Sequence, residues 1–413
     1  MGKIDDLIKS KCPNGVKFLD LEKCCNILDN KRKPVTKSAR TTGEYPYYGA
    51  NGIQDYVADY IFDGKYVLVG EDGSVINENG NPIVTWAEGK IWVNNHAHII
   101  EEIDGVSLRY LYHYIQTINV TSLIHGNIPK LNQGDFRKLQ IAVPPLEVQD
   151  EIVHVLDDFM LLSAELSAEL KARQKQYEYY RDKLLSFENT ETLDTLHTHT
   201  HTHTHGYLLN EIKWLKLSEI CKSIKDGMHN LPKNMIEKTE YPILSAQNIF
   251  DGKIDYNGKR FVDEETYIKE QKRINIEKGD VLLTIVATIG RTAVVDENNN
   301  FLLQRSVCVL KPNNIVNPFY LKFYLDTYKV QEYMTTNAHG SAQAGLYLNQ
   351  VAEIIIPIPS INIQNRIVEI LTNFYKITHD ISEGLPAEIE ARQKQYEYYR
   401  DKLLTFKELV NEG

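Results

Sequence analysis

Ala172-Arg173-Gln174-Lys175-Gln176-Tyr177-Glu178-Tyr179-Tyr180-Arg181-Asp182-Lys183-Leu184-Leu185 recurs without a change at Ala391 to Leu404. Ser186-Phe187, which follows the first copy, becomes Thr405-Phe406 after the second. Identity over such a long stretch within one chain is not chance, so the chain contains an internal repeat.

The similarity between the copies continues upstream in weaker form. Ile141 to Leu146 parallels Ile356 to Ile361, and Gln149 occupies the place of Gln364. The beginnings of the copies also align, with Val16-Lys17-Phe18-Leu19 against Ile212-Lys213-Trp214-Leu215. Each copy is therefore a large, divergent globular part followed by a nearly unchanged helical part.

The helical parts show helical periodicity. Apolar residues recur mostly every three or four positions from Ile152 to Phe187 and from Ile367 to Phe406. Such a seam is typical of a coiled coil, and two seams of equal length predict helices that pack antiparallel on each other. Gly384 and Pro386 interrupt the second seam, which predicts a kink or a restart with Pro386 in the first helical turn.

The globular parts are rich in strand signals. Tyr66 to Val69 and Val281 to Val286 are β-branched runs bounded by glycine and aspartate, and Leu108–Ile115 and Phe319–Leu325 predict corresponding helices. The fold class is therefore α+β, with two strand-rich domains in a pseudo-two-fold arrangement joined by two long antiparallel helices. The predicted domains are 1–145 (first globular domain with a short N-terminal helix), 146–190 (first spacer helix), 191–206 (linker), 207–358 (second globular domain) and 359–413 (second spacer helix).

The composition is that of a globular protein. Of 413 residues, 42% are hydrophobic and 25% are charged. No apolar run approaches the ~18 residues that a membrane span needs, and Met1 to Asp6 is no secretory signal, so we expect a cytoplasmic protein. The five cysteines form no Cys-x-x-Cys pair, which favours reduced thiols over disulfides or zinc, and we expect no metal site.

The net charge of −10 is unevenly distributed. Residues 1–145 carry −1 and residues 207–357 carry zero, whereas residues 146–206 carry −7. The two globular domains are thus neutral enough to present a local basic face to a polyanion. The acidic helical segment should avoid phosphates and dock on protein instead.

Local motifs follow one another in a definite order along the chain: Tyr48 to Ile53, Gly70 to Ser74 and Asn95 to His98 in the first domain, Gly279 to Thr284, Ala287 to Arg291 and His339 to Gln343 in the second, and Pro144 to Gln149 with the repeated tyrosine-rich block in the helices. Together they resemble those of one known family, the specificity (S) subunits of type I restriction-modification enzymes. The resemblance implies two target-recognition domains on a helical spacer. It also implies assembly with two methyltransferase subunits and, for cleavage, two restriction subunits. S-adenosylmethionine, ATP and Mg are then expected on the partner subunits and no cofactor on this chain.

Two dissimilar domains on one rod form a pseudo-dimer that can read a bipartite, asymmetric site in double-stranded DNA. The tandem Ser163-Ala164-Glu165-Leu166 and Ser167-Ala168-Glu169-Leu170 lies within the first helix. One copy accounts for at most ~6 Å of helix, or about one or two base pairs, so the spacer is predicted to act as a ruler. The alternative is a helix built from residues of high helix propensity.

Base readers require hydrogen-bonding side chains on loops or strand edges. The candidates are Ser74, Asn94, Asn95, His96, His98 and Lys130 in the first domain, and Lys225, His229, Gln247, Asn248, Thr288, Arg291, Arg305, Ser341 and Gln343 in the second. Each of them has an alternative as a turn or capping residue. Candidates for partner binding in the repeated block are Tyr177, Tyr180, Arg181, Tyr396, Tyr399 and Arg400, with base stacking as the alternative.

No catalytic residue is predicted. Asn317-Pro318-Phe319-Tyr320 is similar to a signature of adenine methyltransferases, but an asparagine cap followed by proline in the first helical turn explains it. The sequence has neither a phosphate-binding loop nor a glycine-rich loop for S-adenosylmethionine. The alternating tract His197 to His205 is predicted to be a linker, with metal binding as the alternative. The competing functions are a stand-alone DNA methyltransferase or nuclease and a silent protein-binding scaffold.

Overall fold

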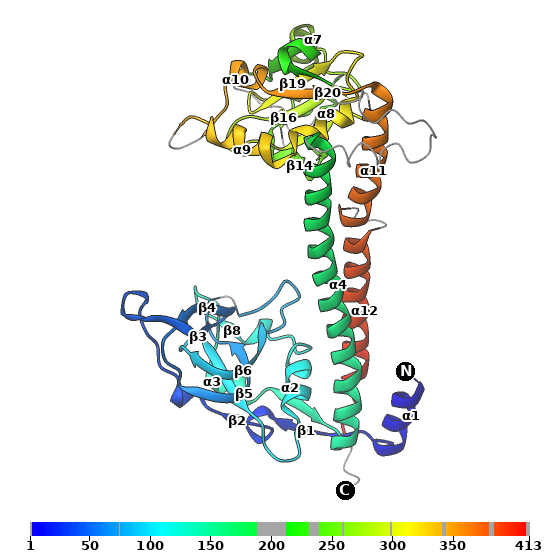
Figure 1. Cartoon of the computed structure of the whole chain (residues 1–413). Helices are drawn as coiled ribbons and strands as arrows, with labels where there is room; N and C mark the ends of the chain where they lie inside the picture. The colour runs from blue at the N-terminus through cyan, green and yellow to red at the C-terminus, as the bar shows by residue number, and fades with distance from the viewer. Residues whose placement is uncertain are drawn as a thin grey trace. The chain divides into compact units, whose positions relative to one another are not determined.

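The computed structural model describes residues 2–73, 75–187, 212–230, 239–257, 260–297, 300–340, 344–379 and 384–409. The chain divides into two compact units, Met1–Ser167 with Ile389–Gly413, and Ala168–Glu388 (Figure 1). Each unit therefore contains one globular part and helical segments from both copies of the repeat. The His/Thr tract lies outside the described residues.

The first unit is built on a sheet of six strands in the order β2-β7-β5-β6-β3-β4. All neighbours are antiparallel except β3 and β6. The strands are β2 (Asn26–Ile27), β3 (Thr42–Gly49), β4 (Gly52–Val57), β5 (Phe62–Gly70), β6 (Val84–Val93) and β7 (Ala97–Glu101). Two small pairs accompany this sheet, β1 (Lys17–Asp20) with β10 (Gln140–Val143) and β8 (Ile124–His125) with β9 (Lys130–Leu131).

Helices complete the first unit. They are α1 (Gly2–Lys11), α2 (Leu108–Ile115), α3 (Gln133–Arg137), the first part of α4 (Leu146–Ser186) and most of α12 (Leu385–Leu403). Tyr396 and Leu403 of α12 are buried in the same core as Ile152 and Leu156 of α4. The ring of Phe159 stacks on that of Tyr399 at 5.4 Å between centroids. The helices thus pack side by side in antiparallel directions.

The second unit repeats this plan with a smaller sheet of four strands, in the order β12-β19-β16-β17. The strands are β12 (Cys221–Asp226), β16 (Val281–Thr284), β17 (Thr292–Val294) and β19 (Val307–Pro312). Three pairs stand beside the sheet, β11 (Lys213–Lys216) with β20 (Ile355–Ile358), β13 (Ile243–Leu244) with β18 (Leu302–Leu303), and β14 (Ile249–Phe250) with β15 (Lys253–Ile254). The helices are α6 (Leu217–Ile220), α7 (Glu264–Arg273), α8 (Pro318–Leu325), α9 (Tyr328–Thr336), α10 (Leu348–Ala352) and α11 (Ile361–His379).

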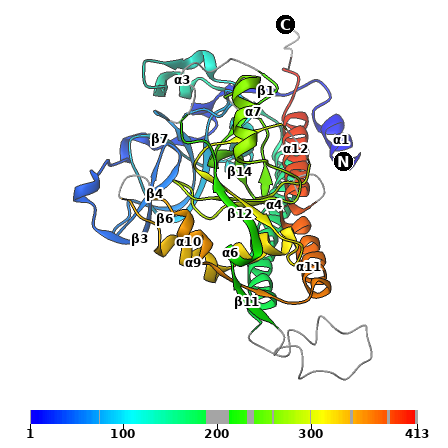
Figure 2. The ribbon, with the colours of Figure 1, turned by 90° about the horizontal axis from the view of Figure 1, so that it is seen from above.

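Helix α11 lies beside the second part of α4 (Figures 1 and 2). The rings of Tyr180 and Phe374 are 6.1 Å apart, which mirrors the contact between Tyr399 and Phe159 in the first unit. Helix α12 begins at Leu385, so the predicted restart with Pro386 in the first turn is confirmed. The α+β class with two strand-rich domains and long antiparallel helices is confirmed as well.

One buried glutamine fixes each spacer helix to its globular part. The side chain of Gln149 accepts a hydrogen bond from the Ser107 amide at 2.9 Å and donates to the carbonyls of Gly105 and Pro144. Gln364 makes the same three bonds, to the Asn317 amide and to the carbonyls of Ile315 and Pro359. Both side chains are fully buried. Backbone groups that would otherwise lack a partner are thus satisfied at equivalent places in both units.

The side chain of Asn317 caps α8. Its Oδ1 accepts hydrogen bonds from the amides of Phe319 and Tyr320, and Pro318 occupies the first helical position. The interpretation of this motif as a helix cap is confirmed. Within the described ranges, every helix is too short or too polar to traverse a lipid bilayer.

Candidate nucleic-acid interface

Three loops meet at one edge of the first globular part, and three equivalent loops meet in the second. We call this arrangement the three-loop edge, formed by residues 49–51, 71–73 and 94–96 in the first unit and by residues 245–247, 285–287 and 304–306 in the second. Five of the loops follow directly on a strand, and the sixth, 49–51, begins at the last residue of β3. The side chains of an edge are therefore held by rigid elements, as a recognition surface requires.

Backbone hydrogen bonds establish the equivalence of the first and third loops. The amide of Asn94 donates to the carbonyl of Tyr48 at 3.0 Å, and the amide of Gln304 donates to that of Leu244 at 2.8 Å. In both units this bond closes a parallel strand pair, β3 with β6 and β13 with β18. The first residue after each of these parallel pairs thus has a counterpart in the other unit.

The second loop follows the same scheme. The Glu71 amide donates to His96 and the Ile285 amide to Ser306, at 2.8 and 2.9 Å. The amides of Gly73 and Ala287 each donate at 3.0 Å to a carbonyl of a further segment, at Pro129 and Ala344. Gly73 and Ala287 both have positive φ, 82° and 66°, which is uncommon for alanine. One backbone design therefore carries different side chains in the two units.

In the second unit the edge borders a cleft of about 700 Å³. Four of the predicted base readers line it, namely Gln247, Asn248, Thr288 and Arg305. Arg260 and Gln304 line it too, and sequence reasoning missed both. Among the described residues that line the cleft, Arg260 and Arg305 carry positive charge and Asp255 is the one acid.

The other predicted readers of the second unit lie elsewhere. Lys225 donates to the carbonyl of Arg273, and His229 bonds Asp226 at 2.6 Å near α7. Arg291 donates to the carbonyl of Ile249 and does not line the cleft. Ser341 and Gln343 lie outside the described residues, as does Ser74 of the first unit.

Within the cleft, Asn248 is a capping residue. Its Oδ1 accepts from the Ser245 amide at 3.0 Å, and its Nδ2 donates to the Asp255 carbonyl at 3.1 Å. Both ends of the side-chain amide are thus engaged in holding the loop. The prediction that Asn248 reads bases is therefore replaced by a positioning role.

In the first unit, Asn95 and His96 are exposed on the edge, and His96 pairs with Asp72. Lys130 is half-exposed and bonds Glu71 at 3.2 Å. Asn94 is 2% exposed, with its side chain bonded to Gln54 and to the His96 amide. The prediction for Asn94 is wrong, because its groups are satisfied inside the domain.

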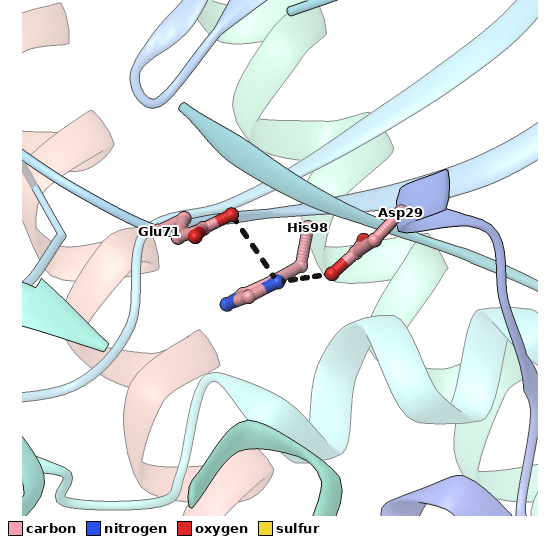
Figure 3. A group of neighbouring side chains, drawn as sticks. All are labelled: Asp29, Glu71 and His98. Atoms are coloured by element: carbon pink, nitrogen blue, oxygen red, sulfur yellow. Dashed lines mark hydrogen bonds and ion pairs between the residues drawn. The ribbon is translucent and has the colours of Figure 1, made fainter. Parts of the chain in front are cut away.

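His98 was also predicted to read bases, and this is wrong, since its side chain is fully buried. Its Nδ1 lies 2.7 Å from Asp29 Oδ2 and 3.7 Å from Glu71 Oε2 (Figure 3), and its Nε2 faces the carbonyl of Leu131. The ring stacks on Phe136 at 4.1 Å. Burial alone would raise the pKa of Asp29, but the hydrogen bond and charge of His98 lower it overall.

Asp29, Glu71 and His98 offer ligand atoms within 4.8 Å of one another, as in a metal site. Two cations already occupy the surroundings, however. Arg32 reaches Glu71 at 2.5 Å and Asp29 at 3.5 Å, and Lys130 bonds Glu71. Both carboxylates of the cluster are already paired with these cations, so a divalent ion would add positive charge without a counter-charge. The geometry therefore favours a buried ion-pair network that supports the three-loop edge.

The six predicted partner-binding residues fall into two groups. Tyr177 and Tyr396 are 4% and 6% exposed and belong to the cores of their own units, so the prediction that they contact a partner is wrong. Burial raises the pKa of Tyr396 to about 12, and its hydroxyl bonds His113. Tyr180, Tyr399, Arg181 and Arg400 are partly accessible and pack against neighbours of their own unit.

The middle tyrosine of each Tyr-Glu-Tyr-Tyr run is more exposed than the other two. Tyr179 and Tyr398 are 59% and 63% exposed, although they lie in the identical block. Lys175 and Lys394 are exposed as well. Sequence reasoning missed Tyr179 and Tyr398 because spacing alone does not tell which tyrosine of a Tyr-Glu-Tyr-Tyr run faces solvent.

Fold and loops together define a duplicated recognition protein on a helical spacer. The family model described as "Type I restriction modification DNA specificity domain" matches twice, at residues 13–173 and 210–391. The chain is 34% identical over 406 residues to a putative type I restriction enzyme specificity subunit of Haemophilus influenzae, covering 95% of this chain and 96% of that one. It is 31% identical to the EcoR124I/EcoR124II specificity subunit of Escherichia coli, over 72% of this chain and 71% of the relative.

Solved structures share the fold. The S subunit of the type I restriction-modification system of M. genitalium matches with a TM-score of 0.53 at 17% identity, covering 94% of this chain and 96% of that one. A chain from a study of complex assembly and conformational transition of the type I R-M system matches with a TM-score of 0.57 at 16% identity, over 95% and 98%. The chain belongs to the type I restriction-modification DNA specificity family.

Proposed function

We infer that this chain gives a type I restriction-modification complex its DNA sequence specificity. Each globular part reads one half of a bipartite, asymmetric site through its three-loop edge. The spacer helices set the gap between the halves and dock the methyltransferase subunits. The chain itself performs no chemistry.

The observation that carries this proposal is the reuse of one loop design with different side chains. Equivalent backbone bonds hold both edges, yet Arg305 stands where the first unit has Asn95. A shared backbone presents its side chains to DNA in the same way, and different side chains select different bases. A site with two unlike halves follows.

The identical block supports docking of identical partners. Tyr179 and Tyr398 are exposed in both copies, so packing within the chain does not account for their identity. Residues 146–206 carry a net charge of −7, with the excess of acid outside the repeated block, which disfavours DNA along the rest of this segment. We propose that two methyltransferase subunits bind there, one at each copy, and that two restriction subunits join for cleavage.

All small-molecule chemistry then belongs to the partner subunits. The methyltransferase subunits would bind S-adenosylmethionine, and the restriction subunits would bind ATP and Mg. The complex would work in the cytoplasm, where the DNA is.

A methyl-transfer assay tests this assignment. The chain alone, the methyltransferase alone and the mixture are each incubated with DNA and labelled S-adenosylmethionine. Transfer by the mixture only is expected. Transfer by the chain alone would instead indicate a self-sufficient methyltransferase, and a mixture that assembles without binding DNA would indicate a scaffold.

The docking surface has its own test. Replacing Tyr179 and Tyr398 by alanine should weaken methyltransferase binding, measured by titration calorimetry. Leu161→Ala is the matched control, because Leu161 is 60% exposed on α4 but lies outside the repeated block. Equal binding by the double variant and wild type would contradict docking at these tyrosines.

A further inference from the structure

The equivalence of the two edges allows residues to be compared position by position. Tyr48 and Leu244 accept the equivalent backbone bonds. Two residues further on, Ala50 and Ala246 are both buried, at 9% and 5% exposure. The next residue is exposed in both units, which makes Asn51 the counterpart of Gln247.

The third loop provides a second pair. Asn94 and Gln304 donate the equivalent amides, so the residues that follow them, Asn95 and Arg305, correspond. Both are exposed. Each edge therefore presents two polar side chains at matched positions, on two loops that adjoin through a parallel strand pair.

These side chains differ from their polar neighbours in having unused hydrogen-bonding capacity. Asn94, His96 and Asn248 are engaged within their own domains. By contrast, none of the described residues hydrogen-bonds the side-chain amides of Asn51, Asn95 and Gln247 or the guanidinium of Arg305. Exposed groups of this kind can exchange water for the edge of a base at little cost in folded-state contacts.

We propose that Asn51 and Asn95 in the first unit and Gln247 and Arg305 in the second are specificity-determining residues, a proposal that rests on the DNA-reading function given above. An amide bonds adenine through N6 and N7, and a guanidinium bonds guanine through O6 and N7. Asn51 and Gln247 carry the same amide and read adenine in both halves. Asn95 and Arg305 carry different groups. Asn95 therefore reads adenine in the first half, and Arg305 reads guanine at the corresponding position of the second half.

Exchange of the third-loop residues tests the proposal. Cells that express the methyltransferase with wild-type chain, Arg305→Asn or Asn95→Arg are compared by methylome sequencing. Arg305→Asn should change one base pair of the second half and leave the first half as it was. Asn95→Arg should do the reverse, so one variant still tests the proposal should the other fail to fold.

Binding measurements give the size of the effect. Loss of one bidentate base contact should weaken binding of the assembled complex to its own site roughly tenfold to a hundredfold. On a duplex in which only the guanine read by Arg305 is replaced, Arg305→Asn should bind much more nearly as well as wild type, because neither protein can make that contact there. Asn51→Ala should likewise relax one position of the first half only.

Arg260→Asn is the matched control, because Arg260 lines the same cleft from outside the edge. It should lower affinity for all sequences alike and leave the motif unchanged, as expected for a phosphate contact. An unchanged motif with Arg305→Asn and Asn95→Arg, or a changed motif with Arg260→Asn, would overturn the assignment while the DNA-reading function stands. Absence of any motif with the wild-type chain would overturn that function and this proposal with it.

Discussion

Replacing Gln149 by methionine removes three hydrogen bonds and hardly changes the volume of the side chain. The change leaves the half-buried amide of Ser107 and the carbonyls of Gly105 and Pro144 without the side chain that satisfies them. Taking about 1 kcal/mol for each lost hydrogen bond, the first unit loses about 3 kcal/mol of stability. For a unit of this size the melting temperature should fall by roughly 6 to 12 °C.

Hydrogen–deuterium exchange measures this loss separately in each unit. Gln149→Met should raise exchange in the first unit and leave the second protected, and Gln364→Met should do the opposite. Gln393→Met is the matched control, since Gln393 is exposed on α12 and its side chain donates to Glu397 on the same helix. If Gln149→Met were within ~0.5 kcal/mol of wild type, the size expected for a surface change, the role of the buried glutamine would be refuted.

Deleting residues 167–170, one copy of the tandem tetrapeptide in α4, should shorten the gap of the methylated motif by about one or two base pairs and leave both halves unchanged; an altered half would contradict the ruler. Burial lowers the pKa of His113, so the unfolded state binds the extra proton and the first unit should lose stability as the pH falls below about 6.5. His113→Gln should flatten that decline in denaturant titrations at pH 7.5 and 5.5, and an equally steep decline would refute the assignment to His113. Tyr375→Phe removes the hydrogen bond that the Tyr375 hydroxyl donates to the Asp251 carbonyl, so exchange should rise in the β14–β15 hairpin, with a loss of about 1 kcal/mol or less. Unchanged exchange there would show that the bond does not hold the hairpin.

Much of the fold could be predicted because its signals are local. The repeated block, the apolar spacing of the helices, the cap at Asn317 and the restart at Pro386 all depend on residues within a few positions of one another. The alternation of buried and exposed positions within loops has no such signal. Asn94 and His98 therefore resembled exposed readers although both are buried.

The sequence did predict Asn95, Gln247 and Arg305 as readers, but the matches between the two edges were beyond sequence reasoning for a different reason. They depend on bonds between distant segments, such as that from the Asn94 amide to the Tyr48 carbonyl. The loop sequences themselves have diverged, so nothing in them aligns Asn51 with Gln247. Only the shared backbone pattern reveals the match.

Whether this chain reads DNA is best decided by methylome sequencing of cells that express it with its methyltransferase partner, compared with cells that lack the chain. We expect a new bipartite motif with unlike halves and a methylated adenine in each. No new motif, with the complex shown to assemble, would contradict the claim that this chain reads DNA.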